Sequence, residues 1–172
     1  MPHPSLLQTE LKQTRPFRSR VEEAVVGLFR TADVVRREQG AVVEARGITL
    51  QQYNVLRILR GAGAEGLPTL DIAGRMVEQA PGVTRLLDRL VAKHLVRRER
   101  CLVDRRQVLC WIEPAGTELL SALQSPMRAA ARRRLGALGP RGLESLITLM
   151  EAVRTESSDP SRTKTKTRRR KS

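Results

Sequence analysis

The chain has 172 residues, a length typical of one domain, and 40% of them are hydrophobic, enough to build a packed core. Its formal net charge of +14 favours a polyanionic partner, while the lack of an apolar run of about 18 residues or of a signal-peptide pattern predicts a cytoplasmic protein with no membrane partner. Two cysteines without a CxxC pair and two histidines exclude a disulfide scaffold and a zinc module, so no cofactor or structural metal is expected.

The N-terminal third contains an arm and two predicted helices. Residues 1–17 have early prolines and no helical period, which predicts a flexible arm. The run Ser19-Arg20-Val21-Glu22 has the spacing of a capping box, and the apolar stripe behind it predicts a helix over 19–39 that stops at Gly40. A second capping box, Thr49-Leu50-Gln51-Gln52, begins a helix that ends near residues 61–63.

Two short helices are expected next. Thr69 is predicted to cap the first of them, with Leu70, Ala73 and Met76 on its apolar side. The second extends from about Ala80 to Lys93, with one side apolar and the other polar; Val83, Leu86, Leu87 and Leu90 form the former, and Thr84, Arg85, Asp88 and Arg89 the latter. Two such helices with a brief connection predict a helix-turn-helix.

Strand-like composition over 95–101 and 107–112 predicts a hairpin with a charged tip. We expect the hairpin to be centred on residues 104 and 105, so that Cys101 opposes Val108 and cannot form a disulfide with Cys110. Pro114 then begins a helix to about Leu135, and Gly139-Pro140 begins the last one, with apolar residues from Leu143 to Val153. The predicted fold class is mainly α: a winged helix-turn-helix.

The exposed elements of this fold are positive, which points to DNA. A helix fits the major groove, and a hairpin beside it reaches phosphates or the minor groove. On the helix, Thr84, Arg85 and Arg89 would face the bases; on the hairpin, Arg97, Arg98, Arg100, Arg105 and Arg106 would contact the backbone and minor groove. The alternative is that these arginines form only a solvated surface.

Five segments form one pattern: Ile72-Ala73, Val83 to Leu90, Leu95-Val96-Arg97-Arg98, Asp104-Arg105-Arg106 and Ile112-Glu113-Pro114-Ala115-Gly116. This pattern resembles the MarR family of transcription regulators, and the resemblance covers about residues 20–155. It implies a homodimer that binds pseudo-palindromic promoter DNA and is released by a small phenolic or amphipathic ligand or by thiol oxidation. It also implies that the first and last helices form the dimer interface. The predicted interface residues are Val21, Val25, Leu28, Leu143, Leu146, Ile147 and Met150.

The resemblance also assigns boundaries and single residues. A domain over 18–156 would contain a DNA-binding lobe at 49–113 and dimerisation helices at 19–39 and 114–156. The family usually has Ser or Thr, and often Arg, at the start of the recognition helix. This chain has Gln79-Ala80-Pro81-Gly82 instead, of which Gln79, Pro81 and Gly82 remain DNA-binding candidates. Glu113 stands where Thr is frequent, and His94 stands where Gly often ends the recognition helix; His94 is read as a helix end rather than a pH or metal sensor.

Other residues have two readings. The resemblance suggests that Arg106 enters the minor groove while Asp104 holds the loop by pairing with an arginine; alternatively, Asp104 is an ordinary turn residue. Cys101, near several arginines, is either a redox sensor or a structural thiol. An effector pocket would be lined by Phe29, Tyr53 and Trp111, although Phe29 and Tyr53 also suit core packing.

The C-terminal residues 157–172 hold seven Lys and Arg against one Asp and no apolar side chain, which predicts a disordered basic tail. We interpret it as an element that attracts DNA; an anionic-membrane tether is the alternative, without an apolar anchor to support it.

The leading function is a homodimeric, sequence-specific repressor, and the alternative is a non-specific nucleic-acid-binding architectural protein. No Gly-rich phosphate loop, HExxH or Ser/His/Asp grouping is present, so no catalytic residue and no enzyme activity is predicted.

Overall fold

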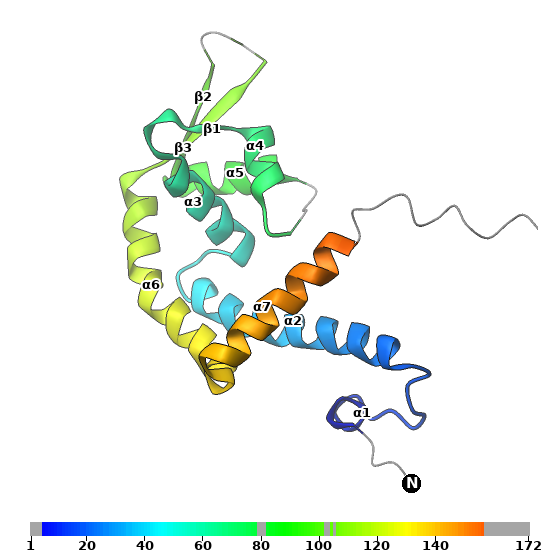
Figure 1. Ribbon diagram of the computed structural model, residues 1–172. Coiled ribbons are helices and arrows are strands. Elements are labelled where there is room, and N and C mark those ends of the chain that lie inside the picture. The colour runs from blue at the N-terminus through cyan, green and yellow to red at the C-terminus, as the bar shows by residue number, and fades with distance from the viewer. Residues whose placement is uncertain (1–4, 79–81, 102–103, 105, 157–172) are drawn as a thin grey trace, which may run out of the picture. The chain divides into compact units, whose positions relative to one another are not determined.

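A computed structural model describes residues 5–78, 82–101, 104 and 106–156. These residues form two compact units, Met1–Ala131 and Arg132–Ser172, which are described separately. The helices (Figure 1) are α1 (Leu6–Glu10), α2 (Arg20–Glu44), α3 (Leu50–Ala62), α4 (Thr69–Arg75), α5 (Val83–Ala92), α6 (Pro114–Leu135) and α7 (Gly139–Glu156), with 3-10 turns η1 (Gly63–Glu65) and η2 (Gly136–Leu138). The strands β1 (Leu67–Pro68), β2 (Val96–Arg100) and β3 (Val108–Ile112) form an antiparallel sheet in the order β1-β3-β2.

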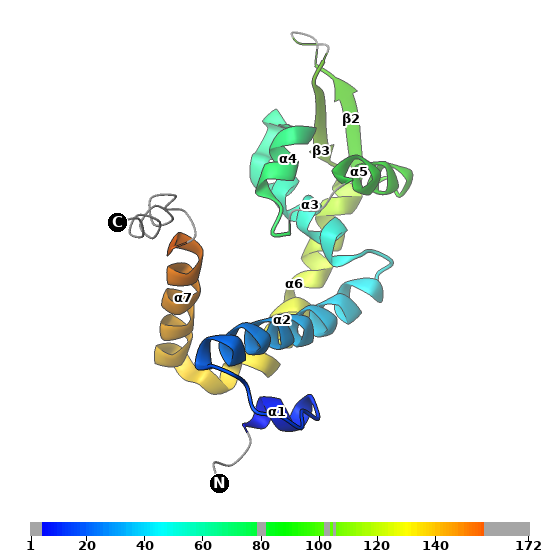
Figure 2. The same ribbon diagram turned by 90° about the vertical axis from the view of Figure 1, so that its right-hand side faces the viewer.

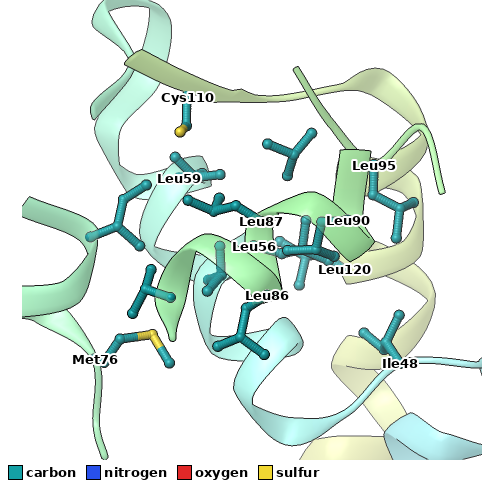
Figure 3. Close-up of a cluster of buried hydrophobic side chains, with 14 of the residues drawn as sticks. Ile48, Leu56, Leu59, Met76, Leu86, Leu87, Leu90, Leu95, Cys110 and Leu120 are labelled. Atoms are coloured by element: carbon teal, nitrogen blue, oxygen red, sulfur yellow. The ribbon is translucent and has the colours of Figure 1, made fainter. Parts of the chain in front are cut away.

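The predicted fold class is confirmed: the described chain is mainly helical, with a helix-turn-helix followed by a hairpin. None of the helices in the described residues is long and apolar enough to cross a membrane. The core of the first unit is formed by α3, α5 and the inner face of the sheet, and α6 adds Leu120 and Leu123 to it (Figure 3). Leu56, Leu87, Leu90 and Cys110 are fully buried there. Because α5 and the hairpin share this core, their positions relative to each other are fixed.

The N-terminal segment contains an element that the sequence did not predict. Ser5 and Gln8 form a capping box around α1, and Leu7 packs on α2 where a Cβ added to Gly27 would lie 3.5 Å from Leu7 Cδ2. Hydrogen bonding from Ser5, helped by Arg20, lowers the pKa of Glu23. This short helix escaped prediction because five residues are too few to show a helical period.

The first long helix runs past its predicted end. Ser19 accepts a hydrogen bond from the Glu22 N–H at 3.1 Å, as the capping pattern predicts, but α2 continues through Gly40 to Glu44. The prediction of a stop at Gly40 is therefore wrong. The extra turn is favoured because it buries Val43 completely in the core, which outweighs the weak helix propensity of one glycine. Helix α3, in contrast, has the predicted capping box and the predicted end.

Thr69 does not cap α4. It is the first helical residue, Pro68 occupies the N-cap position, and the Thr69 hydroxyl donates to the Val108 carbonyl oxygen at 3.4 Å. The predicted apolar side also differs, because Leu70 is exposed and Ile72 is buried. The hydroxyl thus joins α4 to β3, and Ile72 and Met76 fix which side of the helix-turn-helix faces the core.

The hairpin register is one residue from the prediction. Arg100 rather than Cys101 opposes Val108, and the Cys101 N–H donates to the Gln107 carbonyl at 3.0 Å. A hydrogen bond from the Gln107 N–H to the Asp104 carbonyl (2.9 Å) closes the tip and centres the hairpin on Asp104. Cys101 and Cys110 are both free thiols, as predicted.

The second unit consists of the end of α6 from Arg132, the turn η2 and α7. Helix α7 begins at Gly139 as the sequence predicts. Its residues Ile147, Leu149 and Val153 are more than half exposed, while Leu143, Leu146 and Met150 are partly buried. An exposed apolar side of this kind is what a helix needs to pack against another molecule.

Candidate nucleic-acid interface

Helix α5 has an exposed polar side. Gly82 precedes it with a φ of +100°, a left-handed conformation that non-glycine residues rarely adopt, and this turn starts the helix at Val83 rather than near Ala80 as predicted. Four apolar residues of α5 are buried as predicted, while Thr84, Arg85 and Arg89 are exposed. The exposed side therefore offers one hydroxyl and two guanidinium groups in successive turns of one helix.

The hairpin of β2 and β3, called the wing below, projects beyond α4 and α5 in both views of the molecule (Figures 1 and 2). Arg98 on β2 forms an ion pair with Asp88 on α5, and this contact joins the wing to the exposed side of the helix. Between them lies an open groove of about 440 Å³, whose lining includes Val91, Arg100 and Val108. The second half of α5 and the part of the wing strands nearer the tip thus flank one groove.

The wing has two different faces because side chains alternate along a strand. Arg98 and Arg100 are on the face towards α5, whereas Arg97 is on the opposite face, 4.1 Å from the centroid of the Trp111 ring and paired with Glu99 and Glu113. The prediction had placed all three arginines in one DNA-binding cluster. The structure separates Arg97 from that cluster, and we leave it out of the proposed interface.

The tip of the wing is organised by Asp104. Its carboxylate accepts hydrogen bonds from the Arg106 backbone N–H at 3.0 Å and from the Gln107 side-chain amide at 3.1 Å. This is the turn-residue alternative, in which the carboxylate shapes the loop by binding its backbone. Arg106 is exposed and has no ion pair among the described residues. Four predicted positions, Gln79, Ala80, Pro81 and Arg105, lie outside the described residues.

The segments on either side of the wing explain two features of the sequence. His94 has a φ of +56° and its N–H donates to the Val91 carbonyl, so it ends α5 as predicted. Gly116 lies where an added Cβ would be 2.5 Å from the Leu95 carbonyl oxygen, which leaves room only for hydrogen. The Glu113 N–H donates to that same carbonyl at 3.0 Å. These contacts fix where α6 leaves the sheet.

The three aromatic residues predicted to line an effector pocket are not brought together. The Trp111 indole N–H donates to the Ala64 carbonyl beyond the end of α3, whereas Tyr53 is in the first turn of α3 and lies 6.0 Å from the Arg57 guanidinium. At 1.5 Å per residue this separates Tyr53 from Ala64 by about 16 Å. Phe29, on α2, is 70% exposed. Within one chain the structure therefore does not bring Tyr53 and Trp111 together, because they lie near opposite ends of α3.

The thiols occupy different environments. Cys110 is buried and its Sγ lies 3.8 Å from the Thr69 hydroxyl; burial raises the pKa of this thiol. Cys101 is partly exposed at the start of the wing tip. Within the part of the chain that the structure describes, no three His, Cys, Asp or Glu residues are grouped to hold a metal ion.

The sequence did not reveal the internal contacts of the basic residues. Arg98 is committed to Asp88, and the Lys93 ammonium donates to the Gly47 carbonyl at 2.6 Å. Strand alternation could have separated Arg97 from Arg98 in advance. The Lys93 contact joins positions 46 residues apart and leaves no signal in local spacing.

Comparison with known proteins places this geometry in a family. The sequence model of the MarR family matches residues 48–108. The chain is similar to a solved MarR transcription factor from Planctomyces limnophilus, with 40% identity, a TM-score of 0.63, and coverage of 79% of this chain and 98% of that chain. None of the curated protein sequences compared with the chain matches it.

Two further solved structures share the fold at 23% identity. One is the S. aureus MepR–DNA complex, with a TM-score of 0.68 over 75% of this chain and 95% of that chain. The other is Bordetella bronchiseptica BpsR, whose DNA binding is regulated by 6-hydroxynicotinic acid, with a TM-score of 0.67 over 77% and 98%. At this identity the likeness concerns the fold alone.

Proposed function

The chain belongs to the MarR family of DNA-binding transcription regulators, and on this premise we propose that it is a homodimeric, sequence-specific repressor rather than an enzyme. The observation that supports this most directly is that one packed body carries both the exposed polar side of α5 and the wing face with Arg98 and Arg100, which lines a groove against the second half of α5. In this proposal α5 enters the major groove and is the recognition helix, while the wing follows the backbone into the minor groove.

Base reading is assigned to Thr84, Arg85 and Arg89, the exposed polar side chains of α5. Arg85 and Arg89 have no ion pair among the described residues, so their guanidinium groups are available to guanine edges or phosphates. Arg100 and Arg106 are the corresponding exposed cations on the wing, and Arg98 orients the wing through Asp88. The candidates Gln79, Pro81, Gly82 and Arg105 would lie beside these residues at the helix start and the wing tip.

A homodimer is supported by apolar side chains that are exposed in the single chain. On α2, Val21, Val25 and Leu28 are exposed by 73%, 47% and 51%, and on α7 Ile147 is exposed by 52%. Apolar surface of this extent on helices is typical of an interface. Two recognition helices about one helical turn apart would require an inverted repeat with half-sites roughly 10 base pairs apart, a pseudo-palindromic operator.

For release from DNA we propose a small amphipathic or phenolic effector, supported by the shared fold with BpsR, or oxidation of the partly exposed Cys101. The separation of Tyr53 from Trp111 means that an effector site would not be built from the predicted aromatic set. The two routes differ in one simple test: a Cys101→Ser variant keeps ligand-induced release and loses release by peroxide.

The proposal is tested by selecting fragments of the organism's own genome on the purified protein and competing them with random duplex DNA. A regulator should prefer the selected fragments by about 10³-fold or more at physiological salt, and the fragments should share an inverted repeat. Equal affinity for selected and random duplexes would support the alternative, an architectural protein whose tail and wing only neutralise phosphates.

A further inference from the structure

Helix α2 and the connection that follows it make polar contacts with the segments at both ends of the recognition helix. Near the C-terminal end of α5, the Lys93 ammonium donates to the Gly47 carbonyl, which follows α2, at 2.6 Å. Before the N-terminal end, Glu78 in the segment between α4 and α5 forms an ion pair with Arg36 of α2 at 2.8 Å. Between these two contacts lies the whole of α5.

The Lys93 ammonium lies at the C-terminal end of α5, where a positive charge is favourable. Lys93 is the C-cap residue of α5, where its N–H bonds to the Leu90 and Val91 carbonyls. A cation is stabilised at a helix C-terminus by the helix dipole, and here the same ammonium also reaches Gly47 in the connection between α2 and α3. The charge is thereby directed to backbone carbonyls of the protein.

The contact at Glu78 holds a segment that burial does not hold. Met76 is buried, but the next residue, Val77, is 86% exposed and Glu78 is exposed too, so apolar packing holds neither of these two residues. Two polar contacts do so instead: the Val77 N–H donates to Asn54 Oδ1 on α3 at 2.9 Å, and Glu78 pairs with Arg36. The entry into the recognition helix is therefore attached to both α3 and α2.

The C-terminal end of α2 is anchored in the same core as α5. Val43 near its end and Ile48 just after it are buried together with Leu86 and Leu90, and Figure 3 shows Ile48 in this cluster. The N-terminal half of α2 carries the exposed Val21, Val25 and Leu28. One helix thus links the apolar surface that we assign to dimerisation with both ends of the helix that we assign to base reading.

We propose that Arg36, Glu78 and Lys93 are positioning residues: they hold the recognition helix in one orientation on α2 and so set the half-site spacing that the dimer accepts. The inference rests on the proposed function. None of the three residues needs to touch DNA, because each already contacts another part of the chain. They act by limiting how far α5 rocks when two recognition helices must fit one operator together.

The test measures binding of Glu78→Gln and Lys93→Met to the selected operator, to versions with one base pair added or removed between half-sites, and to random duplex. Each variant should lose about three- to ten-fold in operator affinity, and its preference for the native spacing should fall by a similar factor. Affinity for random duplex and the salt slope should stay as in the wild type. A Lys93 that instead binds phosphate would lower the salt slope by about 0.9 per contact and weaken all duplexes alike.

Matched variants separate positioning from loss of charge or stability. Arg46→Met removes a neighbouring exposed cation and should leave spacing preference unchanged. Lys93→Arg, which keeps a donor, and the exchange Arg36→Glu with Glu78→Arg should restore the native preference. Because exposed pairs contribute little to stability, thermal midpoints should move by less than about 2 °C.

Folded variants whose spacing preference equals that of the wild type and of Arg46→Met would overturn the inference while leaving the proposed function intact. A wild-type protein that binds random duplex as tightly as selected fragments would overturn the proposed function and this inference with it.

Discussion

Replacing Gly116 with alanine should displace the junction between the wing and α6. The added Cβ would lie 2.5 Å from the Leu95 carbonyl oxygen and 2.8 Å from Ile112 Cγ1, so one of these elements must shift by about 1 Å to restore ordinary contact. Overpacking of this kind costs about 1–3 kcal/mol, and loss of the hydrogen bond from the Glu113 N–H to Leu95 adds about 1 kcal/mol. Alanine regains about 1 kcal/mol of helix propensity. The expected net loss is about 1–3 kcal/mol.

Urea unfolding followed by the fluorescence of Trp111, the single tryptophan of the chain, measures this loss close to the junction. With a slope of about 2 kcal/mol per molar, the midpoint should fall by roughly 0.5–1.5 M at a fixed protein concentration. The control is Gly61→Ala in α3, where nothing lies within 4 Å of an added Cβ. It should raise the free energy of unfolding by about 0.5–1 kcal/mol. If both substitutions stabilise the protein equally, the packing argument is wrong.

Four further results are expected. Arg106→Ala should weaken operator binding, more at A·T-rich sites if the side chain reads groove width, whereas Arg97→Ala, on the opposite face of the wing, should leave affinity within about two-fold while lowering stability. Ile147→Glu, alone or with charged residues at the adjacent apolar positions of α7, should convert the dimer to monomers in sedimentation; an unaltered dimer would refute the interface. Deleting residues 157–172 should reduce the slope of log affinity against log salt, and an equal slope would show that the tail does not contact DNA. Because burial raises the pKa of Cys110, the unfolded chain releases this thiol proton first as pH rises above about 8.5, so stability should decline there and Cys110→Ala should decline less.

The helices were largely predictable because their signals are local. A side-chain cap satisfies backbone donors within three residues, so Thr49 and Gln52 mark the start of α3 whatever surrounds them. The predicted stop at Gly40 was wrong because the low helix propensity of glycine is outweighed by the burial of Val43 in the core. Thr69 misled for the same reason, since its hydroxyl finds an acceptor on β3, 39 residues away.

The interface could be predicted as a set of elements but not as a set of contacts. The apolar and polar sides of α5 follow from its sequence period, which correctly exposed Arg85 and Arg89. The partners of the wing arginines depend on the hairpin register, and the predicted register was one residue off because the hydrogen bond that closes the tip is not encoded in the strands. A one-residue shift changes which cross-strand residue each arginine faces. Charge counts alone cannot make this distinction.

The same contacts divide the positive charge of the protein between two tasks. Arg36, Arg97, Arg98 and Lys93 are engaged with carboxylates or carbonyls of the chain. Four other exposed cations on the recognition helix and the wing have no ion pair among the described residues; they are Arg85, Arg89, Arg100 and Arg106. Because cations that contact phosphates release counterions from DNA, the folded lobe should attract DNA less than its number of Lys and Arg residues suggests. The paired cations instead hold α5 and the wing in place, and this positions the unpaired cations for contact with DNA.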